Sequence, residues 1–111
     1  MMTHQRINDL HEAIKTSRGG VAAIWEYSAS LSQLTVRVTW ENSAENMHFI
    51  CNACTRIEAS STWGIVDFEI QILEDDRFAL IDHNAKFFLE CGLIRVFRNM
   101  PPLLEVAMGA G

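Results

Sequence analysis

The sequence predicts an α+β domain, in which one N-terminal helix packs on a curved antiparallel sheet of about six strands, mostly in meander order. Three observations support this prediction. An amphipathic stretch comes first, over residues 3–18. Short segments in which apolar and polar residues alternate then fill residues 21–98, separated by polar turns. No repeat or long linker divides the 111 residues, so we expect a single domain over 1–111.

The helix is predicted over residues 3–18. Ile7, Leu10 and Ile14 fall on one helical face, which is expected to pack on the sheet. Thr3 is the candidate N-cap, because a threonine hydroxyl can accept a hydrogen bond from the first turn. Two glycines follow residue 18, and they mark the end of the helix because glycine readily adopts positive φ.

Residues 21–28 and 34–40 are predicted as the two arms of a hairpin. Each arm carries large apolar side chains at every second position, which we expect to face the core. Thr35, Arg37 and Thr39 occupy the alternate positions of the second arm and are expected to face solvent. The apolar positions are Val21, Ala23, Trp25 and Tyr27 in the first arm, and Leu34, Val36, Val38 and Trp40 in the second.

The stretch from Met47 to Glu58 fits two templates. Apolar residues at positions 47, 50, 51, 54 and 57 match a helix, whereas those at 47, 49 and 51 match a strand. Most residues from His48 to Thr55 are weak helix formers. We therefore predict a strand with an irregularity near Asn52.

Three further strands are predicted, over residues 65–73, 77–81 and 87–98. The first of them alternates most clearly. Its apolar positions are Val66, Phe68, Ile70 and Ile72, and its polar positions are Asp67, Glu69 and Gln71.

The remaining residues, 99–111, are predicted to form an apolar tail. Two prolines end the ladder, because proline lacks a backbone donor. A single helix about 10 Å wide cannot cover a face of about six strands that lie about 4.8 Å apart. Three other covers are available, namely the sheet curling on itself, the tail and a second copy of the chain, and we favour a homodimer. The predicted interface residues are Leu103, Leu104, Val106 and Met108.

Composition excludes several classes of partner. The formal net charge of −5 opposes binding to phosphate backbones, so no nucleic-acid partner is expected. The same charge would suit a basic protein, which is the kind of protein partner that the composition allows. No apolar run approaches the length of about 20 residues that a membrane span needs. Residues 1–8 lack the apolar centre of a secretory signal, and three cysteines are an odd number, so we expect a cytoplasmic protein.

Cys51 and Cys54 form a CxxC pair that could chelate a soft metal or exchange disulfides. A structural zinc site normally needs four ligands, which would have to include His48, Cys91 or His83. No second tight pair is present, and a thioredoxin-like site would need the pair at the start of a helix. We therefore interpret these cysteines as small buried side chains, and predict no metal or cofactor.

Acid–base and pocket chemistry has weaker support. Asp67 and Glu69 share one face of a strand, as the residues of any solvated strand face do. Trp25 and Trp40 are in phase with the apolar residues of their strands and are expected in the core, whereas Trp63 follows a turn and is expected nearest the surface.

The favoured function is therefore a small intracellular binding or interaction protein, since the sequence contains no recognisable catalytic constellation. One alternative is a ligand-binding or catalytic domain with a pocket on the curved sheet. Its lining would include Trp25, Trp40 and the polar residues Arg37, Asp67 or His83. A second alternative is a metal or thiol protein that uses Cys51 and Cys54.

Overall fold

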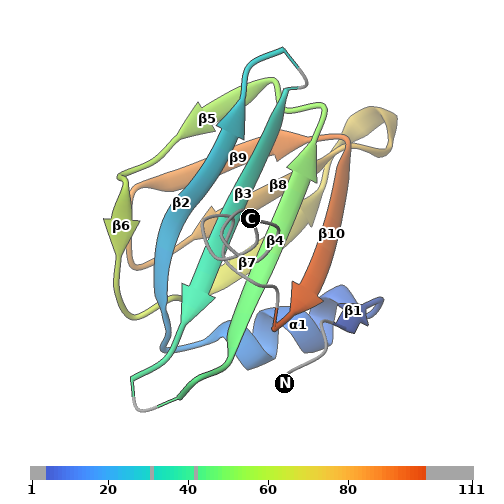
Figure 1. Ribbon diagram of the computed structural model, residues 1–111. Helices are drawn as coiled ribbons and strands as arrows, with labels where there is room; N and C mark the ends of the chain where they lie inside the picture. Colours follow the sequence, from blue (N-terminus) through green and yellow to red (C-terminus); the bar gives the residue numbers. More distant parts are fainter. Residues whose placement is uncertain (1–4, 31, 42, 100–111) are drawn as a thin grey trace, which may run out of the picture.

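The computed structural model describes residues 5–30, 32–41 and 43–99. Its strands form two antiparallel sheets stacked face to face, with an α-helix across one end (Figure 1). The predicted α+β class and antiparallel pairing are confirmed. The strands are divided between two sheets, however, and the second sheet covers the apolar face of the first. The sequence alone had not decided what covers that face.

The larger sheet has six strands in the order β1-β10-β4-β3-β2-β6, and the smaller has four in the order β5-β9-β8-β7. The six-stranded sheet contains β1 (Gln5–Ile7), β10 (Leu93–Arg98), β4 (Asn46–Asn52), β3 (Gln33–Thr39), β2 (Val21–Ser28) and β6 (Thr62–Trp63). The four-stranded sheet contains β5 (Arg56–Glu58), β9 (Phe87–Cys91), β8 (Phe78–Asp82) and β7 (Phe68–Ile72). The helices are α1 (Leu10–Ser17) and the short 3-10 helix η1 (Glu74–Asp76).

The helix is shorter than predicted and begins later. Residues Gln5–Ile7 form β1, which pairs with β10, so the predicted start of the helix is wrong. The cap is Asp9, whose side chain accepts hydrogen bonds from the backbone N–H groups of His11 and Glu12 at 3.0 and 3.2 Å. The predicted cap, Thr3, lies outside the described residues. The helix contacts β1 of one sheet and β7 of the other.

Strand β2 has the predicted bounds but not the predicted face. Ala22 is fully buried, whereas Trp25 and Tyr27 are 39% and 54% exposed. The alternation is out of phase with the prediction from the start of the strand, because Ala22 and Ile24 are the residues that pair with the buried Val38 and Val36 of β3. Trp25 therefore faces outward, and it is the extra residue of a β-bulge that shifts the pairing between Ile24 and Glu26. The predicted core position of Trp25 is therefore wrong, and its indole lies on the outer face of the sheet.

Two irregular points carry the chain from one sheet to the other. The predicted strand with an irregularity near Asn52 is confirmed: β4 ends there, Ala53 has a positive φ of 55°, and β5 follows in the other sheet. The single strand predicted over residues 87–98 is wrong, because it divides at Gly92 into β9 and β10. The N–H of Gly92 donates to the carbonyl of Asn52 at 2.9 Å, so both crossings lie side by side.

Aromatic rings fill the space between the sheets. The rings of Phe49 and Phe68 meet edge to face at 5.2 Å, and Trp63 stacks on Phe87 at 4.7 Å. Trp63 is only 9% exposed, so its predicted surface position is wrong. Its indole N–H donates to the buried carboxylate of Asp82 at 2.7 Å, which satisfies the one polar group that would otherwise keep the ring near water.

Candidate binding site on the outer face of the six-stranded sheet

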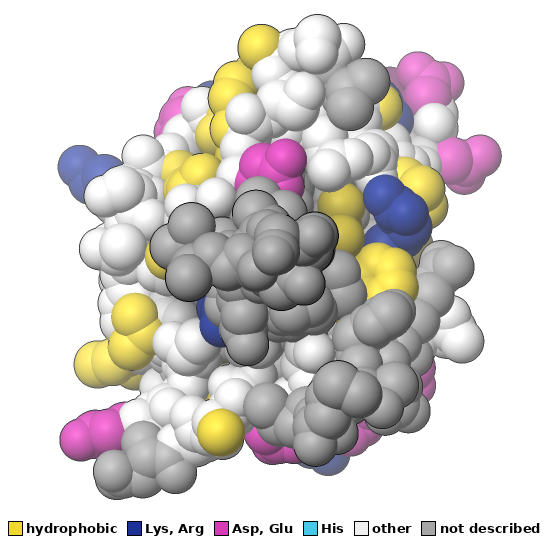
Figure 2. All heavy atoms as spheres, in the orientation of Figure 1, with side chains coloured by type: hydrophobic (Ala, Val, Ile, Leu, Met, Phe, Trp, Pro, Cys, Tyr) yellow, Lys and Arg dark blue, Asp and Glu magenta, His cyan; other side chains and the backbone are white. Residues whose placement is uncertain are grey.

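The outer face of the six-stranded sheet brings four functional side chains together. Trp25 projects from β2, Arg37 from β3, His48 from β4 and Arg95 from β10, and we call these four residues the outer-sheet cluster. Arg37 and His48 are directly opposite in the register of β3 and β4. Figure 2 views this face, where basic side chains lie beside hydrophobic ones on the right, over β10 of Figure 1.

Trp25 and Arg37 form the aromatic and cationic centre of the cluster. The guanidinium carbon of Arg37 lies 4.5 Å from the centroid of the Trp25 ring, a cation–π contact. The ring of His48 lies 6.3 Å from the same indole and is tilted by 52°. Alternation along β2 produces this arrangement, because Ile24 pairs with the inward-facing Val36 and Trp25 therefore takes the face that carries Arg37 and His48. The bulge then places Glu26 opposite Thr35 on the same face.

His48 is neutral at physiological pH. It is 4% exposed, and burial followed by the charge of Arg37 lowers the pKa of His48 from 6.5 to about 4. Its Nε2 atom is buried and has no hydrogen-bond partner in the described part of the chain. The cluster therefore offers an uncharged imidazole with an unused polar atom beside a permanent cation.

A chain of amides positions Arg95. Its Nη2 donates to the side-chain oxygen of Asn52 at 3.1 Å, and the amide of Asn52 donates to Gln33 at 2.8 Å. The Nε of Arg95 is buried without a hydrogen-bond partner among the described residues.

Carboxylates are scarce on this face. No carboxylate occupies the described outward positions of β3, β4 or β10. Glu26, which is exposed, lies opposite Thr35 at the β2 side of the face.

The cysteines form a separate, interior cluster. Cys51 and Cys91 come from opposite sheets, are fully buried and share a hydrogen bond. This bond raises the pKa of Cys51, an effect to which burial adds, and lowers the pKa of Cys91. The thiol of Cys54 donates to the carbonyl of Cys51 at 3.3 Å.

The predicted additional metal ligands do not join these thiols. His48 points to the opposite face of β4 from Cys51, because the two positions differ by an odd number of residues. His83 contacts Glu69 on the four-stranded sheet at 3.2 Å. Within the described residues, no group of three or more His, Cys, Asp and Glu side chains could hold a metal ion.

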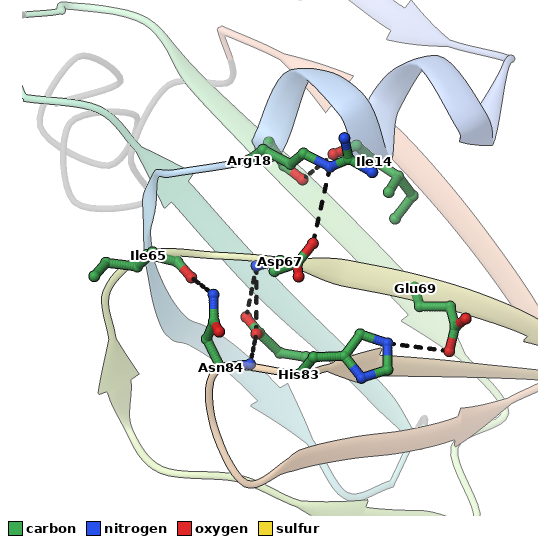
Figure 3. A network of polar contacts seen from close by, with 9 residues as sticks. Ile14, Arg18, Ile65, Asp67, Glu69, His83 and Asn84 are labelled. Carbon is green, nitrogen blue, oxygen red and sulfur yellow. Dashed lines mark hydrogen bonds and ion pairs between the residues drawn. The ribbon is translucent and has the colours of Figure 1, made fainter.

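The predicted carboxylate pair is divided between two partners. Asp67 faces Arg18 at 3.8 Å, whereas Glu69 contacts His83, as Figure 3 shows. A carboxylate that sequence reasoning missed, Asp82, is 2% exposed and accepts the N–H groups of Asp67 and Asn84 as well as the indole N–H. These contacts satisfy it fully, which indicates a structural role.

A pocket of about 540 Å³ opens between β2, β3 and β5, away from the outer-sheet cluster. None of the residues that the sequence predicted to line a pocket lines this one. Among those predicted residues, Trp25 and Arg37 contact each other, but they do so on the outer face. Trp40 packs against the core instead. The pocket lining consists of Ile24, Tyr27, Leu34, Ile57, Ala59, Ser60 and Ser61.

Comparison with known proteins adds no relative: no family model, curated protein or solved structure matches this chain. No helix among the described residues is long and apolar enough to cross a membrane. The predicted interface residues Leu103, Leu104, Val106 and Met108 lie outside the described residues.

Proposed function

We propose that this chain is a small binding protein that contacts a partner through the outer-sheet cluster. The observation that carries the proposal is the stacking of Arg37 on Trp25, an indole that is 39% exposed on the outer face of a sheet. Tryptophan and arginine are the side chains most enriched at the energetic centres of protein interfaces. A surface pair of this kind offers apolar area and directed donors at one point.

The surroundings of the pair support binding rather than catalysis. His48 is held neutral by burial and by Arg37, but no described carboxylate, thiol or hydroxyl is hydrogen-bonded to it as a nucleophile or orienting group would be. Thr35 and Asn46, which share the outer face, are each 4% exposed and supply neutral polar groups. The face therefore offers recognition groups on rigid strands.

The alternative is a ligand-binding domain that uses the pocket between β2, β3 and β5. Its volume of about 540 Å³ lies in the range typical of small-molecule sites. The lining is mostly apolar, with the hydroxyls of Ser60 and Ser61 at one side. A small apolar molecule with one polar group would suit this lining. Self-association through residues 103–108 stays a separate prediction.

Panning a random peptide library tests the proposed function. The library is selected on the wild-type protein and on Trp25→Ser, with Ile72→Ser as the matched control. Ile72 is 78% exposed and lies on the other sheet, so its replacement removes apolar surface without touching the cluster. We expect peptides that bind the wild type and the control but lose at least tenfold in affinity for Trp25→Ser. Equal binding to all three proteins, or no selected peptide, contradicts the proposal.

A further inference from the structure

We infer that the ligand of the outer-sheet cluster is an acidic peptide segment, bound by Arg37 and Arg95 through its carboxylates. This inference rests on the proposed function and specifies the chemistry of the partner. Three features of the described residues carry it: the distribution of charge on the face, the unused buried polar atoms, and the spacing of the two arginines.

The charge of the face differs from that of the whole chain. The chain has a formal charge of −5, yet the described outward positions of β3, β4 and β10 hold two arginines and no carboxylate. Charges farther away than about 10 Å are largely screened at physiological salt. An acidic ligand at this face therefore experiences the local arginines more strongly than the distant acidic groups.

Two buried polar atoms on the face need acceptors or donors. Nε of Arg95 is a donor without an acceptor, and Nε2 of His48, a residue 4% exposed, also has no partner in the described part of the chain. An unsatisfied buried polar group is costly, so such atoms in a stable protein call for an explanation. A carboxylate offers two oxygens, which can accept from Arg95 and from the Nε2–H tautomer of His48.

The spacing of the arginines favours an extended peptide over a single small anion. Arg37 and Arg95 are separated by two strand spacings and one two-residue step along the strands, which corresponds to about 12 Å between their Cα atoms. Carboxylates at alternate residues of an extended peptide lie about 7 Å apart, and both guanidinium groups can reach inward toward them. Two arginines are too few to hold a nucleic acid against the net charge of this chain.

The experiment measures binding of two synthetic peptides of ten residues by fluorescence anisotropy. One peptide has Glu at alternate positions, and the other has Gln in place of every Glu. Inorganic phosphate and a single-stranded oligonucleotide serve as competitors. We expect the Glu peptide to bind at least tenfold more tightly than the Gln peptide and to weaken as salt rises, while neither competitor displaces it at equal concentration.

The variants locate the site. Arg37→Gln with Arg95→Gln should weaken the Glu peptide at least tenfold, whereas the matched control Arg56→Gln, which removes an exposed arginine from β5, should change nothing. Arg95→Lys retains the charge but loses the forked donors, and should fall between these results. The circular dichroism spectrum and melting temperature of Arg95→Lys verify that this variant is folded. If the double variant does not fold, Arg95→Lys alone tests whether Arg95 binds the peptide.

Several outcomes overturn the inference. Equal binding of the Glu and Gln peptides, unchanged binding by a folded Arg95→Lys, or displacement by phosphate or oligonucleotide would each exclude an acidic peptide as the specific ligand. No binding of the Glu peptide would do the same. If peptides selected by panning depend on Trp25 but carry no acidic residues, the proposed function stands and this inference alone fails.

Discussion

Acidification should destabilise the fold through His48. Burial and the neighbouring Arg37 lower the pKa of His48 from 6.5 to about 4, so the unfolded chain binds a proton that the folded protein does not. Stability is therefore retained above pH 6.5 and is lost as the pH falls from 6.5 toward 4. At about 1.4 kcal/mol per pKa unit, the loss is about 2 kcal/mol at pH 5 and about 3 kcal/mol in full.

The charged groups around the imidazole set the sign of this effect. Burial and Arg37 on β3 disfavour a protonated His48; Arg95 lies on the neighbouring strand β10, and Glu26 on β2 is exposed on the same face. Replacing His48 by Gln keeps a polar side chain that does not titrate. The variant should therefore lose about 2 kcal/mol less than the wild type between pH 7 and pH 5.

Urea unfolding at pH 7, 6 and 5, followed by circular dichroism, measures this difference. The pH stays at or above 5 so that most carboxylates remain ionised. His83→Gln is the matched control, because it removes a histidine whose side chain is 54% exposed and leaves the outer-sheet cluster intact. The reasoning is refuted if the free energy of unfolding of His48→Gln falls with pH as steeply as that of the wild type.

Three further predictions concern the interior. Asp82→Ala leaves the indole N–H of Trp63 and two backbone donors unsatisfied, so urea unfolding should show a loss of about 3 kcal/mol, and a loss below 1 kcal/mol would contradict the structural role of this carboxylate. Gly20→Ala should cost about 1–3 kcal/mol, measured in the same way, because the new methyl carbon would lie 2.5 Å from Cγ1 of Val38; an unchanged stability would show that the strands part easily. Cys54 is the only partly exposed cysteine, so Ellman's reagent should titrate one thiol in the folded protein and all three in guanidinium. Because burial raises the pKa of the Cys54 thiol, its reaction should be slower than that of a free thiol; three equally fast thiols would contradict the buried pair.

Prediction of the elements succeeded where local signals suffice. The bounds of β2 and the irregularity after Asn52 follow from alternation, weak helix propensity and turn residues, all of which act over a few positions. The start of α1 was missed because Ile7 fits the apolar face of a helix equally well, whereas the hydrogen bonds of β1 to β10 come from residues about 90 positions away.

Prediction of the site was less complete. The sequence singled out Trp25 and Arg37 as candidates for a pocket, and the structure places them in contact. It gave no sign that His48 belongs with them, since that residue drew attention only as a neighbour of Cys51. Alternation along β4 separates His48 from Cys51, and this parity could have been used once the strand was assigned.

The sequence by itself determined the class of this protein, the positions of most strands and the residue types available for binding, because composition and periodicity are local properties of the chain. Only the tertiary structure decided which sheet each strand joins and which face each side chain takes. The register of β2 with β3 pairs Ile24 with Val36 and so sets Trp25 on the outer face, and the register of β3 with β4 sets Arg37 opposite His48. Both depend on hydrogen bonds between separate strands, which no local pattern specifies.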